Sequence, residues 1–437
     1  MEKTKRFAIY TTVVLLLCCL AKVYGQESKR LDLKTAVKTA LTYNERAASA
    51  DEMSAAASAR VLRARSAFLP TITATGTYTR RPNEVTRTIN EQQIVVQSRN
   101  ALAGNVNVNL TLFDSRSFPI FRQLTLNRQA EVYNAIDSKR RLAFEVCSVY
   151  LLTLSTHQVY KAAEERFAYS RQNLDASKAR FEAQLVSSND VTRAELEYAT
   201  AEKSIVRAQG DMETTRLQLE YLLGIPIEGD IDTPERLLVE AEQPPPPEES
   251  SIILARQQRP DLKSLDFQSR AQHAYAREPL LRWLPNLSFT GQYRFTNESG
   301  LSGQNTNWSV GLTSTWAILD GFLRIGDYKE RKALSRIADL DYQAAFRQVD
   351  TEVRTALANL QSQQTSLKRA AVARDIARKN ASETAELYRQ GLTGILQAAD
   401  ANVSLFEAEV DWIRERYLLA TTFLNLRTAL GQDPVDE

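Results

Sequence analysis

The sequence predicts a mixed α and β membrane protein, in which long coiled-coil helices accompany four strands long enough to cross a bilayer. Three observations predict this class. Four segments alternate polar and apolar residues, long segments carry heptad spacing, and both patterns occur once in each half of the chain, in the order helix–strand–strand–helix. Only 15 Gly and 13 Pro occur among 437 residues, which suits long uninterrupted helices.

The start of the chain predicts a signal peptide at residues 1–25. A basic start with Lys3 and Lys5 precedes the apolar run Phe7–Ala21, and small residues stand before Gln26. The alternative is a membrane anchor, but a run of about 15 residues is short for a spanning helix. No later apolar stretch approaches the length of a spanning helix, so we expect any membrane crossing to use strands.

The cysteines offer neither a disulfide nor a nucleophile. Cys18 and Cys19 lie in the expected signal peptide, and lipidation is disfavoured because Leu17, rather than a small residue, precedes them. Cys147 is then alone in the mature chain, where it cannot form an internal disulfide. A buried apolar role on a helix is expected for it.

A repeat organises the rest of the chain. Phe68-Leu69-Pro70 recurs as Trp283-Leu284-Pro285, and an alternating strand follows each Pro. The expected parts are a first repeat, an extended Pro-rich linker, a second repeat and a short tail: residues 26–240, 241–250, 251–434 and 435–437.

The four strands are expected at residues 71–80, 105–113, 286–296 and 307–318. In the second strand Val106 and Val108 oppose Asn105 and Asn107, so one face is apolar and the other polar without charge. Lengths of about 9–11 residues suit tilted membrane strands. The alternative is a soluble sandwich with the apolar face as its core. The loop Arg80–Gly104 is expected to be extracellular.

Four strands cannot close a barrel, because membrane barrels begin at about eight strands. Open sheet edges are forbidden in lipid, where unpaired backbone groups find no water. The chain must therefore oligomerise, giving eight strands in a dimer or twelve in a trimer.

The helical segments carry sustained heptads, at residues 191–222 and 396–424. The segments before them, about 120–184 and 322–390, would each reach roughly 100 Å as helices. Such helices suit either a wide tube with a wet lumen or a solid antiparallel bundle.

The sequence indicates neither an enzyme nor a nucleic-acid-binding protein. The 55 basic and 53 acidic residues nearly cancel, so no field attracts nucleic acid. His157 and His273 lie in different repeats without ligand-spaced companions, and no phosphate loop or nucleophile elbow is present. We expect no catalytic residue, no metal and no cofactor.

Several local patterns, in order over about residues 31–434, give the chain a family resemblance. They are the opening Leu31-Asp32-Leu33-Lys34-Thr35-Ala36, the segment Ala64–Pro70, and the strand exits Leu112-Phe113-Asp114 and Leu319-Asp320-Gly321. Together they resemble the TolC family of outer-membrane efflux proteins. The resemblance implies a homotrimer with a twelve-stranded barrel in outer-membrane lipid and a coiled-coil tunnel in the periplasm.

The same resemblance implies the exit duct of a tripartite efflux pump or type I secretion system. Its expected partners are a periplasmic adaptor (membrane fusion) protein and an inner-membrane transporter. A pore-less periplasmic coiled-coil spacer or adaptor is the alternative, but it leaves the four strands without a role.

The resemblance also implies that two helical tips contact the adaptor. The corresponding residues are Leu185, Val186, Ser187 and Ser188 on the first tip, and Gly391, Leu392 and Thr393 on the second. The chain departs from the family at Gln184, where Gly is usual, and at Gln390 and Gly394.

Asp400 and Gln397 are the residues expected at the periplasmic gate. Some family members carry two acidic residues one turn apart there; Asp400 matches the second, and Gln397 stands where the first would be. A ring of Asp400 carboxylates would attract cations. The alternative is a solvated helix residue with an intersubunit partner such as Arg389. Asp190 is expected to cap its helix rather than to act in gating.

Overall fold

The computed structural model describes residues 30–89, 92–227, 229–298 and 304–435. The predicted signal peptide therefore lies outside the described residues. The chain forms two compact units. The tip unit contains residues before Ala50, Ser138–Arg259 and residues after Gln348, and the sheet unit contains Ala50–Asp137 and Pro260–Gln348.

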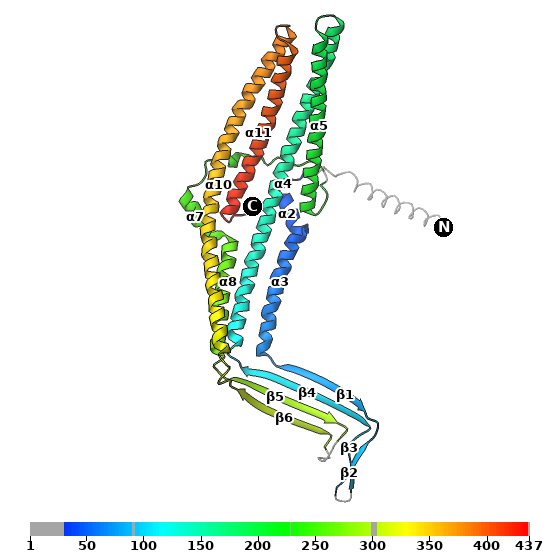
Figure 1. Ribbon diagram of the computed structural model, residues 1–437, viewed down its shortest axis with the longest axis vertical. Helices are drawn as coiled ribbons and strands as arrows, with labels where there is room; N and C mark the ends of the chain where they lie inside the picture. The colour runs from blue at the N-terminus through cyan, green and yellow to red at the C-terminus, as the bar shows by residue number, and fades with distance from the viewer. Residues whose placement is uncertain (1–29, 90–91, 228, 299–303, 436–437) are drawn as a thin grey trace, which may run out of the picture. The chain divides into compact units, whose positions relative to one another are not determined.

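The first half of the chain runs from two helices through the first strands to a long helical hairpin (Figure 1). Its elements are α2 (Leu33–Tyr43), α3 (Glu45–Arg65), η1 (Ser66–Phe68), β1 (Thr71–Arg80), β2 (Val85–Ile89), β3 (Gln92–Gln97), β4 (Asn100–Phe113), α4 (Ser117–Glu182) and α5 (Ser188–Leu223).

After a short helix, α6 (Glu235–Ala241), the second half runs through three further helices and two strands to another long helical hairpin. Its elements are α7 (Glu248–Gln258), α8 (Pro260–Ala276), α9 (Glu278–Leu281), β5 (Asn286–Thr296), β6 (Thr306–Thr315), α10 (Leu323–Arg389) and α11 (Ile395–Ala429). None of the helices in the described segments has the length and apolarity needed to cross a membrane.

The expected extended linker at 241–250 is wrong at both ends. α6 runs to Ala241 and buries Leu237 and Leu238, while α7 already begins at Glu248. Acidic Glu248 and Glu249 in the first turn favour that early start, because they complement the helix dipole. Only the proline run between these two helices remains outside regular structure.

Two expected strand boundaries and one loop also need correction. β4 begins at Asn100 rather than at residue 105, since its first residues pair with the end of β1. β6 ends at Thr315 rather than at residue 318; its last partner is Asn286, and Pro285 before it has no N–H to continue the ladder. The expected loop Arg80–Gly104 holds the β2–β3 hairpin and the start of β4.

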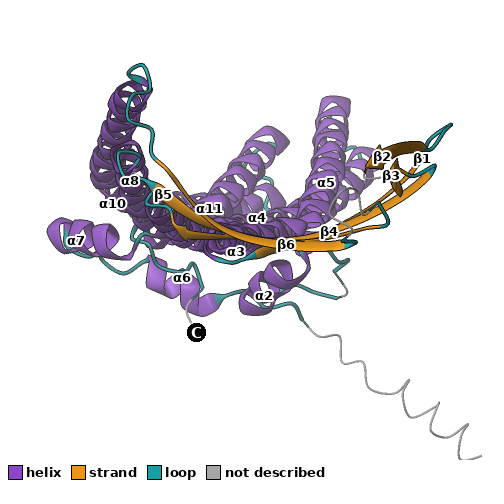
Figure 2. Cartoon of the chain, turned by 90° about the horizontal axis from the view of Figure 1, so that it is seen from below, coloured by secondary structure: helices purple, strands orange, loops and turns teal. Residues whose placement is uncertain are grey.

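The four long strands form one antiparallel, curved sheet in the order β1-β4-β5-β6 (Figure 2). Its large apolar side chains are not covered: Ile72 is 69% exposed, Trp308 70% and Leu312 67%. Every residue of β1 is exposed. The sandwich interpretation is therefore wrong, because no second layer of the described chain covers the apolar face.

The main core lies in the tip unit, where α2, α4, α5 and α11 pack together. Leu142, Tyr150, Leu219 and Leu424 are fully buried in it. The hydroxyl of Tyr150 lies 2.7 Å from the carbonyl oxygen of Leu31 and 2.6 Å from that of Asp232. The single hydroxyl proton of buried Tyr150 is therefore shared between backbone oxygens of the two segments that meet there.

A glycine ends the last helix of each half and packs against a break between two earlier helices. Gly224 follows α5 with φ +72°, and a Cβ there would lie 3.2 Å from the carbonyl oxygen of Tyr43. Gly431 follows α11 with φ +86°, and a Cβ there would lie 2.8 Å from the backbone nitrogen of Arg259. Both sites favour glycine for their conformation, and Gly431 also requires it for space.

Candidate functional site at the helical tips

The first tip turns from α4 into α5 through a residue in the left-handed region. Gln184 has φ +59°. Its N–H donates to the carbonyl of Phe181 at 2.9 Å, and the N–H of Leu185 donates to that of Arg180 at 2.9 Å. This pair of bonds is the Schellman ending of a helix, which favours Gly at the left-handed position. The first tip therefore adopts this turn with the less favourable Gln.

α5 starts from a capped end. The backbone N–H of Ser187 donates to the carboxylate of Asp190 at 3.2 Å, so the acidic side chain satisfies a donor at the helix start and complements its dipole. The expectation that Asp190 caps its helix is confirmed.

The second tip uses the same turn with different residues. Gly391 has φ +77°, and the N–H groups of Gly391 and Leu392 donate to the carbonyls of Tyr388 and Leu387 at 3.1 and 2.9 Å. α11 then starts from Gly394, which has no capping side chain.

Gln397 occupies in α11 the position that Asp190 occupies in α5. A Cβ on Gly394 would lie 3.0 Å from Oε1 of Gln397, so this carboxamide folds back over the helix start. The residue expected at the gate is therefore held beside the turn.

The seven residues expected to contact an adaptor lie on these two turns and at the start of α5. Leu185 is 75% exposed and Leu392 is 70% exposed, while Val186 and Thr393 are half-buried. Each turn thus presents one strongly exposed leucine to solvent.

Asp400 is exposed on the face of α11 that also carries Gln397, while Ile395, Ala398 and Ala401 are buried on the other side. Within the described chain its carboxylate has no hydrogen-bond or ion-pair partner. Arg389, the partner considered for it, pairs with Glu386. An exposed carboxylate three residues after Gln397 shares one side of the helix with it.

A contact between the two hairpins of the chain was not expected from the sequence. The guanidinium of Arg180 on α4 lies 4.8 Å from the ring centroid of Tyr388 on α10, and the hydroxyls of Ser177 and Tyr388 lie 3.4 Å apart. Below this contact Leu174, Ala194 and Ile395 form a small buried cluster with Tyr388. The only sequence signal is that Arg180 and Tyr388 each stand within one turn of the left-handed residue of their tip.

Titratable groups elsewhere in the described residues do not assemble a reactive site. No group of three His, Cys, Asp or Glu side chains among them could hold a metal ion. Burial raises the pKa of Cys147 to about 12, so the thiol stays protonated, as expected for a buried apolar role. Burial lowers the pKa of His157, and His273 bonds to Asp339 at 2.9 Å.

The sequence pattern of the outer membrane efflux protein family matches residues 27–225 and 252–432. The toluene efflux pump outer membrane protein TtgC of Pseudomonas putida is 24% identical over 381 residues, covering 84% of this chain and 76% of that protein. The outer membrane protein TolC of Escherichia coli is 24% identical over 367 residues, covering 76% of this chain and 70% of that protein.

Among solved structures, the CmeC outer membrane channel of Campylobacter jejuni superposes with a TM-score of 0.77 at 16% identity, covering 93% of this chain and 87% of that one. This likeness shows the fold, a mostly helical chain with a small sheet, and the sequence match shows the family. The chain thus belongs to the outer membrane efflux protein family, the TolC family of outer-membrane channels with helices that extend into the periplasm.

Proposed function

We propose that three copies of this chain form the exit duct of a tripartite efflux pump or type I secretion system. The observation that carries the proposal is the sheet, whose apolar face is exposed and whose edge strands β1 and β6 are each paired on one side only in the described chain. Lipid solvates an apolar face well but cannot satisfy a strand edge. The sheet edges therefore need copies of the same chain.

A trimer fits a duct better than a dimer. Two copies would give eight strands, and side chains fill the interior of a barrel of that size. Twelve strands leave room for a lumen, which the neutral Asn and Thr faces of the strands would line. Pairing β6 of one copy with β1 of the next is a head-to-tail contact, and threefold rotation closes it into a ring.

An internal duplication would give each protomer two similar hairpins for the periplasmic tunnel. α4 and α10 have 66 and 67 residues, and α5 and α11 have 36 and 35. Six hairpins of nearly equal length would then surround the lumen of the trimer. The protein acts as a passive conduit in this proposal, and we assign it no catalytic residue.

We place the gate at Asp400 and Gln397, and the adaptor contact at the two tips. Exposed, unpaired Asp400 suits a wet anionic ring around a threefold axis. Leu185 and Leu392 offer apolar anchors for a periplasmic adaptor, which would connect the duct to an inner-membrane transporter. The Arg180–Tyr388 contact would hold the two hairpins of a protomer together in the closed state.

The duct itself is tested by outer-membrane fractionation, followed by gel migration of the unheated and heated protein and by recordings in planar bilayers. We expect an outer-membrane oligomer of three chains that separates on heating and conducts ions. A soluble monomer without conductance would overturn the proposal and favour a periplasmic spacer.

The gate is tested by Asp400→Asn in single-channel recordings. Removal of three clustered charges should lower the cation-to-anion permeability ratio, because the ring is the narrowest charged point of the proposed path. Glu407→Gln is the matched control, since Glu407 is also exposed on α11 but lies two turns further along it. An unchanged ratio in Asp400→Asn would remove Asp400 from the gate.

A further inference from the structure

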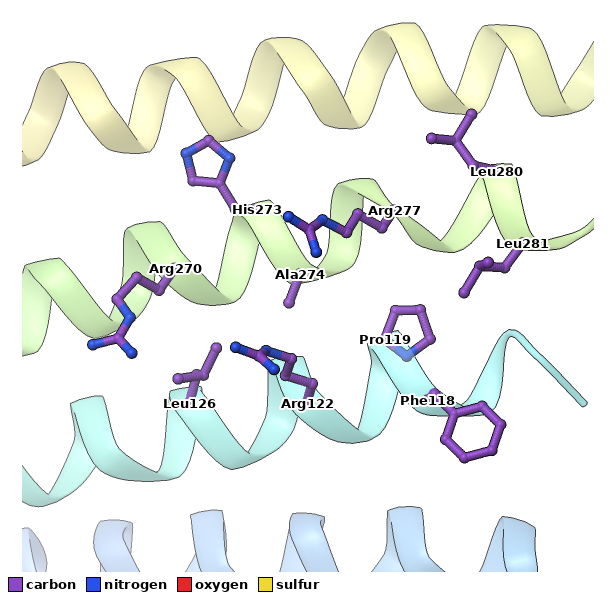
Figure 3. A pocket seen from close by; sticks show the side chains of 10 residues that line it. All are labelled: Phe118, Pro119, Arg122, Leu126, Arg270, His273, Ala274, Arg277, Leu280 and Leu281. Atoms are coloured by element: carbon purple, nitrogen blue, oxygen red, sulfur yellow. The ribbon is translucent and has the colours of Figure 1, made fainter.

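A cavity of about 740 Å³ lies in the sheet unit between the first turns of α4 and the end of α8 with α9 (Figure 3). Its lining is mainly apolar, with buried Leu126 and Ala274, half-buried Leu281, and exposed Phe118 and Leu280. Nothing in the proposed transport path uses this groove.

Three arginines, Arg122, Arg270 and Arg277, line the same groove, and no carboxylate lines it. Figure 3 shows Arg122 and Arg277 reaching it from facing helices, with Ala274 between them. Arg270 lies 3.4 Å from Asp266, and His273 is bonded to Asp339. Arg122 and Arg277, in contrast, have no ion-pair partner among the residues that the structure describes.

This combination favours a particular chemistry. Guanidinium groups bind phosphate through a fork of N–H donors. A free, fully hydrated anion would make no favourable contact with the apolar lining. An amphiphile with a phosphate head and a hydrocarbon tail satisfies both parts of the groove.

The groove lies beside the ends of the strands, where it would meet such molecules in a membrane. β4 ends at Phe113 just before α4 begins at Ser117, and α9 ends at Leu281 just before β5 begins at Asn286. If the strands cross the outer membrane, as the proposed function requires, the groove opens where they leave its periplasmic leaflet, which consists of phospholipid.

We propose that this groove binds an anionic phospholipid, with the headgroup phosphate on Arg122 and Arg277 and the acyl chains over Phe118 and Leu280. The inference rests on the proposed membrane crossing of the sheet. It assigns to the arginines a role in seating the sheet unit at the membrane boundary.

Native mass spectrometry of the purified full-length oligomer tests the proposal. The probes are phosphatidylglycerol, phosphatidylethanolamine with the same acyl chains, and inorganic phosphate as a competitor. Phosphatidylglycerol should bind in preference. Arg122→Gln with Arg277→Gln should weaken its binding about 25-fold, or roughly fivefold per arginine. Arg128 is an exposed arginine of α4 outside the groove, so Arg128→Gln should leave the binding unchanged.

Equal retention of the two lipids, or equal losses in the double variant and in Arg128→Gln, would overturn the proposal. Displacement of the lipid by inorganic phosphate at equal concentration would also overturn it, because a free anion would then be the better ligand. Conductance of the same preparations separates the two hypotheses. A conducting oligomer without lipid preference contradicts only this inference, whereas lipid binding to a non-conducting protein contradicts the duct.

Discussion

The two hairpins of the chain, α4 with α5 and α10 with α11, have nearly the same lengths but different residues at their turns and ends. The first tip places Gln184 where the second places Gly391, and both residues adopt the left-handed conformation. The first caps its second helix with Asp190, where the second has Gln397. The two turns thus share a backbone geometry but differ in the side chains that set charge and strain. Corresponding positions in the two halves can therefore be compared within one protein.

The largest difference is expected at the exits from the strands. Arg324 after β6 is almost fully buried and donates to Asp320 at 2.6 Å and to the carbonyl of Ile318 at 3.3 Å, with its guanidinium 3.9 Å from the ring centroid of Trp283. Arg116 after β4 donates to Asp114 at 2.8 Å, but its side chain is 43% exposed.

We therefore expect Arg324→Ala to lower the free energy of unfolding by about 3 kcal/mol, because the bond of a buried guanidinium to Asp320 and its packing on Trp283 are both lost. Arg116→Ala should cost about 1 kcal/mol or less, as exposed ion pairs do. Thermal unfolding of both variants in detergent measures the difference. Equal losses would show that the two strand exits are equivalent despite their burial.

The second difference concerns the glycines that end α5 and α11. Gly431→Ala adds a strained left-handed residue and a Cβ 2.8 Å from backbone, and should cost about 2–3 kcal/mol. Gly224→Ala meets its nearest backbone atom at 3.2 Å and should cost about 1–2 kcal/mol. The order of their midpoints in thermal unfolding checks this, and a less stable Gly224→Ala would reverse the argument from space.

The third difference is at the tips, where swapping Gly and Gln between the two left-handed positions should have opposite effects on stability. Gln184→Gly removes a left-handed side chain and should stabilise the first turn by about 1 kcal/mol, whereas Gly391→Gln should destabilise the second by a similar amount. Hydrogen exchange of the amides of Leu185 and Leu392 measures each turn locally. Slower exchange at Leu392 in Gly391→Gln would contradict the prediction.

Sequence patterns predicted the regular parts of this fold, because periodicity is local. The ranges expected for the strands at 71–80 and 286–296 coincide with β1 and β5. The start of β4 was missed because Ala101, Ala103 and Gly104 give almost no contrast between faces, so pairing with β1 decides it. The proline run predicts a longer linker than the structure has, because α7 begins at Glu248, directly after the last proline.

The candidate site was only partly predictable, for a different reason. Asp190 reveals its capping role through its place after Ser187. The Arg180–Tyr388 contact joins residues that are 208 positions apart, and the arginine groove joins α4 to α8 and α9. Such contacts depend on which helices pack together, and the heptads of α4 and α10 do not specify their partners.

The smallest expected effect concerns acid, and here the two halves should agree. Burial raises the pKa of Asp114 and of Asp320, but hydrogen bonds from Arg116 and Arg324 outweigh it, so both pKa values lie below the ordinary value. A carboxyl whose pKa is lower in the folded state stabilises the protein above its unfolded pKa of about 4. That stability is lost as the pH falls through the lower, folded value.

The thermal midpoint of the oligomer should therefore decrease when the pH is lowered from 6 to 3. The decrease should be smaller in Asp114→Asn and in Asp320→Asn than in the parent protein. Arg116→Ala and Arg324→Ala remove the donors that lower the two pKa values, so they should reduce the acid sensitivity in the same direction. Suppose that the midpoint of Asp114→Asn decreases as much as that of the parent, while the decrease is smaller in Asp320→Asn. The loss of stability in acid would then come from the exit after β6 alone. The strand exits would then differ in electrostatics as well as in packing.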